Sequence, residues 1–458
     1  MSGLIIIALY FLTMLVIGVA SRRKARGIDD FFVAGRKSPS PFVVGSLLAT
    51  IIGGSATIGM AGLGFQQGLT GAWWLLVGSI GLVFLGLFFA KKVRRLALYT
   101  LPELVERQYD QRMALAASIL IVVAWIGIIA AQIIAAGQIL GILGAGSPTI
   151  WMVIFTAIFV TYTILGGQHA IIRTDFLQSI IIFAGIFAGL ALLLSRLGGW
   201  EGLRISLPAE RFAFPLSPQF NGAALITLLL LVGLTYLVGP DMYSRIFCAR
   251  DDRAASTATL WTAALIIPLA FAITVIGMGA ASLFPDIAPE QAFPTVINEL
   301  FSPLLAGIIL AALLCAVMSS ADTTLLSAST ILTIDIIGKF RPAASPANIV
   351  PRSKWAIVLL GICALILALM LKGVISALLF AYTIYTSGVI IPVIAGFFKH
   401  RLKVTPAGAL AALIGGGFVG LISKLLDIKY LDLGALLISG GLLFLVSYLH
   451  RRFRSAAR

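Results

Sequence analysis

A cluster of hydroxyl side chains and one carboxylate lies inside a long apolar stretch near residue 320, which reads AVMSSADTTLLSAST. On a helix, an arc of about 100° holds most of the polar positions, and Asp322 lies at its edge. Hard cations take oxygen ligands from hydroxyls, carbonyls and carboxylates. Because helix packing alone explains only two or three such hydroxyls, the stripe predicts a cation path. Its members are Ala316, Ser319, Ser320, Thr323, Ser327 and Thr330.

Two apolar runs carry residues that break helices, and a break exposes the backbone carbonyls that such a site needs. Gly53 and Gly54 fall in the middle of the second run, where glycine loosens a helix. The pair Gly239–Pro240 interrupts the seventh run, because proline lacks an N–H donor and clashes with the preceding turn. The interrupted runs stand five apart, which is typical of a transporter built from two inverted repeats.

The composition indicates a membrane protein. The chain has 458 residues, 60% of them hydrophobic and 11% charged, with a mean hydropathy of +1.06. We therefore expect a single all-α integral-membrane domain over residues 1–458, with about 13 transmembrane helices. The expected spans are 3–20, 40–65, 71–90, 113–142, 148–166, 175–195, 221–240, 256–284, 298–338, 355–371, 374–398, 407–423 and 430–449.

The spacing of the breaks divides this domain into four parts. A leading helix covers 3–20, and a first repeat of five helices covers 40–195. A second repeat of five covers 221–398, and two trailing helices cover 407–449. This 5+5 arrangement rests on spacing and interruption, since the two halves show no obvious similarity in sequence.

The basic residues predict the orientation. The formal net charge is +15, but most of the 33 Lys and Arg residues fall on the inner segments if the N-terminus lies outside. This bias is the positive-inside pattern, so we expect the N-terminus outside, the C-terminus inside, and a cytoplasmic-membrane location. Nucleic-acid binding is not expected. The basic residues on outer segments are Arg196, Arg204, Arg211, Lys372, Lys424 and Lys429.

Few acidic residues fall in or beside the spans, and a carboxylate at mid-membrane needs a partner or a wet cavity. We expect Asp241 and Asp335 near the inner boundary as capping residues, and Asp175 in an interfacial ion pair with Arg173. Asp322 differs because apolar sequence extends far on both sides. Histidines are too few for a proton relay, and the absence of a nucleophile–base set or metal-ligand cluster argues against an enzyme.

The sequence resembles the sodium/solute symporter family, which includes sodium-coupled proline, pantothenate, sialic acid and sugar carriers. The resemblance covers nearly the whole chain, and implies a LeuT-type fold. It rests on DDFFVAGR, ATIIGGSATIGMAGLGF, GGQHAIIRTDFLQ, GPDMYSRIFCARD and AVMSSADTTLLSAST, of which the first and last are the most specific.

The resemblance implies Na⁺ as the coupling ion. Its ligands would be the carbonyls of Ala49, Ile52 and Ala316 and the hydroxyls of Ser319 and Ser320. Some members hold a second Na⁺, and the matching residues here mark a second ion site or an exit path. Members with two Na⁺ usually have serine where this chain has Asp322. The matching residues are Asp175, Asp322 and Thr323.

The resemblance also implies a solute site between the two broken helices, beside the first Na⁺. No buried Arg or Lys is evident there, so an anionic solute would be held by Na⁺, helix N-termini and hydroxyls. The candidate residues are Thr50, Ile51, Gly53, Tyr236, Gly239, Tyr382, Tyr385 and Ser387.

The sequence therefore predicts a sodium-coupled symporter that imports a small organic solute by alternating access. The solute would be an amino acid, a monocarboxylate, a vitamin or a sugar. Proton coupling, suggested by Asp322, and a solute-sensing membrane receptor are the alternatives. The partners expected are the solute and the lipid bilayer, with no obligatory protein partner.

Overall fold

The computed structural model describes residues 2–21, 27–141, 146–341, 348–371, 373–426, 428 and 431–456. Within these ranges the regular secondary structure is helical apart from two isolated bridges, and ten helical segments are long and apolar enough to cross a membrane. The prediction of an all-α, multi-pass membrane protein is confirmed. One of these segments, Pro148–Leu197, is kinked at Gly167 and contains two of the expected spans. The count of thirteen spans stays a prediction.

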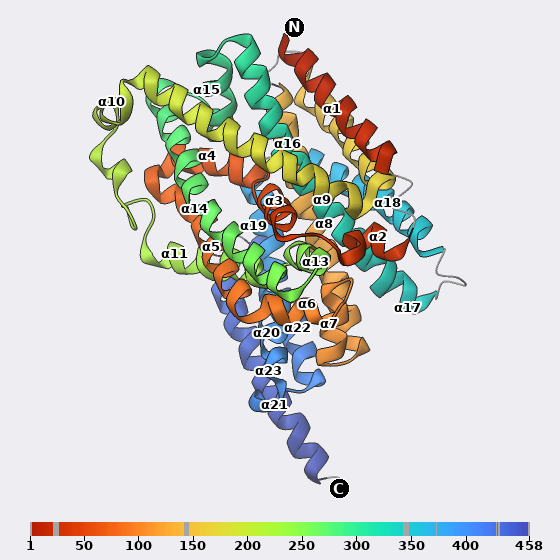
Figure 1. Ribbon diagram of the computed structural model, residues 1–458. Coiled ribbons are helices and arrows are strands. Elements are labelled where there is room, and N and C mark those ends of the chain that lie inside the picture. Colours follow the sequence, from red (N-terminus) through yellow and green to blue (C-terminus); the bar gives the residue numbers. More distant parts are fainter. Residues whose placement is uncertain are drawn as a thin grey trace.

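The helices follow the apolar runs closely, since each run can satisfy its backbone only within itself in a membrane. Figure 1 shows the two termini at opposite ends of the molecule. The main helices are α1 (Ser2–Ser21), α3 (Ser40–Ile51), α4 (Met60–Gln67), α5 (Trp73–Phe84), α8 (Gln111–Gly141), α9 (Pro148–Leu197), α12 (Leu234–Val238), α13 (Pro240–Cys248), α14 (Asp252–Leu283), α16 (Pro303–Ile331), α18 (Ile349–Met370), α19 (Val374–Tyr385), α22 (Pro406–Leu425) and α23 (Leu431–Ala456).

Both predicted helix breaks are present. Helix α3 ends at Ile51, and Ile52 leaves helical geometry with ψ of 64° before a π-helical turn over Ser55–Gly59 leads into α4. At the second break, Gly239 adopts an extended ψ of 133°, which separates α12 from α13. Proline is tolerated at the start of α13 because the first helical N–H has no intrahelical partner.

Helix α16 lies at the centre of the molecule and positions the hydroxyl stripe. It packs against α8, α9, α3 and α1. All its side chains from Ile309 to Ile331 are buried, including those of the stripe. Helices α22 and α23 pack against each other and lie at the C-terminal end of the bundle, away from α16 (Figure 1). The division into repeats of 40–195 and 221–398 stays a prediction.

Candidate functional site: ion and solute sites at the broken helices

The carbonyl end of α3 meets the hydroxyl stripe of α16. Ser320 Oγ donates to the Thr50 carbonyl at 2.6 Å and lies 3.4 Å from the Ala49 carbonyl. The close approach requires glycine, since a Cβ on Gly53 would lie 2.3 Å from Ser320 Oγ. Ile52 and Ala316, whose carbonyls complete the predicted ligand set, are also buried. The structure therefore places Ser320 against the carbonyl end of α3, and the full ligand set stays a prediction.

The oxygen atoms gathered here suit Na⁺. Ser319 Oγ donates to Asp175 Oδ1 at 2.5 Å, and Ser320 Oγ donates to a carbonyl. A hydroxyl that donates its proton keeps two lone pairs, so both serines can still ligate a cation. Carbonyl and hydroxyl oxygens are ligands that hard monovalent and divalent cations accept without a full charge on the ligand set.

A glutamine of α8 stabilises the restart of the broken helix. The Gly54 N–H donates to Gln132 Oε1 at 2.7 Å, which satisfies one of the N–H groups left without an intrahelical partner. Gln132 is buried. The sequence analysis did not select this residue, although an amide in the middle of a largely apolar span was a usable signal.

Asp175 forms a buried ion pair with Arg245, not the expected interfacial pair with Arg173. Arg245 Nη2 lies 3.3 Å from Asp175 Oδ2, and both side chains are 0% exposed. Ser46 of α3 also donates to Asp175 Oδ2. The sequence analysis did not identify Arg245 as a buried residue. Arg245 lies within the bundle, because α13 follows a break deep in the fold and carries this side chain inward.

Arg245 also contacts the hydroxyl stripe of α16. Its Nη2 donates to Thr323 Oγ1, and its Nη1 donates to Gln168 Oε1 and Ser244 Oγ, each at 3.1 Å. Asp322 lies beside this cluster, with Oδ1 3.4 Å from Thr323 Oγ1. Its Oδ2 has no hydrogen-bond partner among the described residues, although the side chain is buried.

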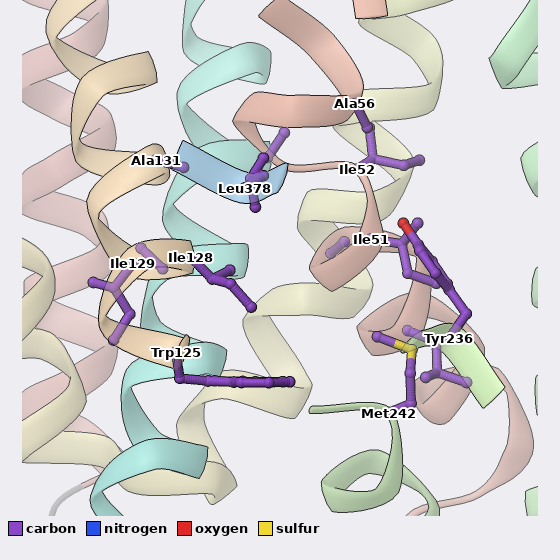
Figure 2. Packing of buried hydrophobic residues seen from close by; sticks show 14 of the residues in the cluster. Ile51, Ile52, Ala56, Trp125, Ile128, Ile129, Ala131, Tyr236, Met242 and Leu378 are labelled. Carbon is purple, nitrogen blue, oxygen red and sulfur yellow. The ribbon is translucent and has the colours of Figure 1, made fainter. Parts of the chain in front are cut away.

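A cavity lies between the two broken helices. Figure 2 shows Ile51, Tyr236 and Met242 gathered on one side and Ile128 of α8 on the other. Four of the predicted solute residues line the cavity, and so does Ser320. The lining residues are Thr50, Ile51, Ser55, Ile128, Gln132, Thr235, Tyr236, Asp241, Met242, Ser320, Thr324 and Tyr382.

The remaining predicted solute residues lie outside this lining. Gly53 and Gly239 form the helix breaks themselves. The Tyr385 hydroxyl donates to the Val238 carbonyl at 2.8 Å, and its ring packs edge-on against Trp125. Ser387 is buried against α22, since a Cβ on Gly416 would lie 2.1 Å from the Ser387 carbonyl oxygen.

Asp241 lines the cavity, so its expected place at the inner boundary was wrong. The residue follows Gly239–Pro240 directly, and the second break turns the first residues of α13 toward the cavity. The break itself was therefore the signal that could have identified it.

A second cavity lies beside residues that bind Arg245. Its lining includes Gln168 and Ser244, which bind Arg245, and also Ser327 and Thr330 of the stripe. Two partners of Arg245 therefore line the second cavity, together with the far part of the stripe.

Taken together, the broken helices, the oxygen-lined contact and the enclosed cavity define a membrane transporter of the LeuT type. The sequence model that describes the sodium:solute symporter family matches residues 31–416 of this chain. The chain therefore belongs to this family. It is a sodium-coupled symporter of a small solute, and Na⁺ is its coupling ion.

Relatives and solved structures agree with this assignment. The chain is 26% identical to the sodium/glucose cotransporter of Vibrio parahaemolyticus, over 94% of this chain and 85% of the relative. It is also 26% identical to an osmoregulated proline transporter of Bacillus subtilis, over 92% and 88%. The solved structure of a Na⁺-coupled sialic acid symporter superposes with a TM-score of 0.80 at 17% identity, covering 98% of both chains, which shows the shared fold.

Proposed function

We propose that this symporter imports a small organic solute through the cavity between its broken helices, using one Na⁺ bound where α3 meets α16. The ligands would be the carbonyls of Ala49, Ile52 and Ala316 with the hydroxyls of Ser319 and Ser320. The observation that carries the proposal is the contact of Ser320 with both Thr50 and Ala49 at the edge of the solute cavity.

Shared residues would couple the ion to the solute. Ser320 belongs to the ion site and also lines the solute cavity, and its hydroxyl donates to the carbonyl of Thr50, another residue of that lining. Na⁺ held there would keep α3 against α16 and favour one of the two access states. Its effect depends on binding the two states with different affinity, because a ligand with equal affinity for both shifts no population.

Substitution of Ser320 tests the ion site. We expect Na⁺, compared with K⁺, to raise the melting temperature of the purified protein, and Ser320→Ala to raise the Na⁺ concentration at half-effect at least tenfold. Ser329→Ala is the matched control, since Ser329 lies on the same helix but bonds back to the Leu326 carbonyl at 2.9 Å. A wild-type Na⁺ response in Ser320→Ala would contradict the site. A response to pH in place of Na⁺ would support proton coupling.

We propose further that a single Na⁺ is coupled, because Arg245 engages the residues of the second-ion candidate set. Its guanidinium contacts Asp175 and Thr323, two of the three members. A fixed cation at that position would repel a second Na⁺. Reversal-potential measurements in proteoliposomes should give a Na⁺:solute ratio of one. A ratio of two would refute this assignment.

We propose that the protein lies in the cytoplasmic membrane with its N-terminus outside and its C-terminus inside, and needs no obligatory protein partner. The bias of Lys and Arg toward the inner segments supports the orientation. Labelling of single cysteines introduced at Ser2 and Ser455 with an impermeant reagent in intact cells tests it. Labelling of the cysteine at position 455 but not of the one at position 2 would contradict this orientation.

A further inference from the structure

The solute cavity contains one charged side chain. Of the lining residues, all within the described part of the chain, Asp241 alone is charged, and the rest are hydroxyl, amide, aromatic or aliphatic. A carboxylate in such an enclosed site is costly unless a positive charge or several donors approach it.

The nearest cation along the chain is already engaged. Arg245, one helical turn beyond Asp241, forms its ion pair with Asp175 and donates to Thr323. Among the ion pairs formed by the described residues, Asp241 takes part in none. Asp241 lies in the first turn of α13, where the helix dipole favours a negative charge, and it lines the cavity.

Two aromatic rings accompany the carboxylate. Tyr236 and Tyr382 line the same cavity as Asp241. Aromatic faces attract ammonium groups, an interaction of about 0.5–2 kcal/mol that grows as water is excluded. A carboxylate with two tyrosine rings is therefore a complete set for holding an amine.

We propose that the transported solute carries a protonated or quaternary amine, which binds Asp241 with Tyr236 and Tyr382 beside it. This inference rests on the proposed function of the cavity. Ser320 and Thr50 line the same cavity beside the ion site. The polar or anionic remainder of the solute therefore points toward Na⁺, and a zwitterion satisfies both ends. An uncharged polyol would leave the carboxylate without a counter-charge.

The selectivity of the unmodified protein is the first test. Thermal stabilisation in NaCl is measured with glycine betaine, L-proline and choline, and with D-glucose, myo-inositol and L-lactate as probes without an amine. At least one amine probe is expected to stabilise the protein, and glycine betaine and L-proline separate a zwitterion from the simple cation choline. Stabilisation by glucose, inositol or lactate with none by the amine probes would overturn the proposal.

Asp241→Asn is the second test, because Asn has nearly the same shape, keeps a side-chain oxygen and removes the charge. The apparent affinity for the stabilising amine should fall at least tenfold, while the Na⁺ half-effect stays within twofold of wild type. Equal amine affinity in both proteins would overturn the proposal. Na⁺-driven uptake of a neutral solute that is insensitive to Asp241→Asn would refute the amine and leave the symport function standing. Failure of the function itself would appear as loss of the Na⁺ response in the unmodified protein.

Discussion

The two broken helices satisfy their exposed backbone in different ways. At the first break, the Thr50 carbonyl accepts from Ser320, a short hydroxyl whose oxygen can also ligate an ion. At the second break, the Val238 carbonyl accepts from Tyr385, a buried ring held by Trp125. The second break also brings a carboxylate, Asp241, into the cavity.

This difference indicates that the two breaks have different functions. The first break offers neutral oxygens, which suit a small cation that must also be released. The second break is stabilised by rigid aromatic packing and presents the charge of the cavity. Arg245 connects the two, since it lies on α13 of the second break and pairs with Asp175, which accepts from Ser46 of the first broken helix.

Loss of the connection between the two breaks should have the largest effect. Arg245→Gln would leave the Asp175 carboxylate buried without a counter-charge, a loss of about 3–5 kcal/mol. We expect a strong fall in melting temperature and in the yield of folded protein, measured by fluorescence-detected size exclusion. The double variant Arg245→Gln/Asp175→Asn removes both charges and should recover much of the stability. Equal instability of single and double variants would show that the pair is not the cause.

A larger side chain at the first break should lower the affinity for Na⁺ more than it lowers the stability of the fold. In Gly53→Ala the added Cβ would lie 2.3 Å from Ser320 Oγ and 2.7 Å from Gln132 Oε1. Overpacking of this kind costs about 1–3 kcal/mol, and here it displaces the hydroxyl of the ion site. The Na⁺ concentration at half-stabilisation should rise at least tenfold. The control is Gly189→Ala, where the nearest atom to a new Cβ lies 3.9 Å away. An unchanged Na⁺ response in Gly53→Ala would contradict the proposed site.

Removal of the tyrosine hydroxyl at the second break should lower the stability of the protein less than the preceding substitutions do. Tyr385→Phe keeps the ring against Trp125 but removes the donor to the Val238 carbonyl, a loss of about 0.5–1.5 kcal/mol. We expect a modest fall in melting temperature with an unchanged Na⁺ response. A large rise in the Na⁺ half-effect would mean that the two breaks are not separate in function.

Ser387→Ala should have the smallest effect. The Ser387 hydroxyl is buried and has no hydrogen-bond partner among the described residues, and the residue lies against α22 rather than in the cavity. We expect a change within about 0.5 kcal/mol and unchanged solute affinity, measured by thermal shift with the stabilising solute. A tenfold loss of solute affinity would restore Ser387 to the solute site, where the sequence analysis placed it.

The sequence by itself determined the class of protein, both helix breaks and the hydroxyl stripe. These features are local: apolar runs must form helices in lipid, Gly53–Gly54 and Gly239–Pro240 weaken them at known positions, and helical periodicity aligns Ser319, Ser320 and Thr323. Residue types and spacing are sufficient for predictions of this kind.

Only the tertiary structure decided which charges meet. Arg245 was assigned to the inner surface and Asp241 to a helix cap, yet Arg245 pairs with a carboxylate 70 residues away and Asp241 faces the cavity. Such pairings depend on how α9, α13 and α16 pack in three dimensions and on the direction in which each helix resumes after its break. A break can be read from the sequence, but the rotation of the helix beyond it is set by long-range packing.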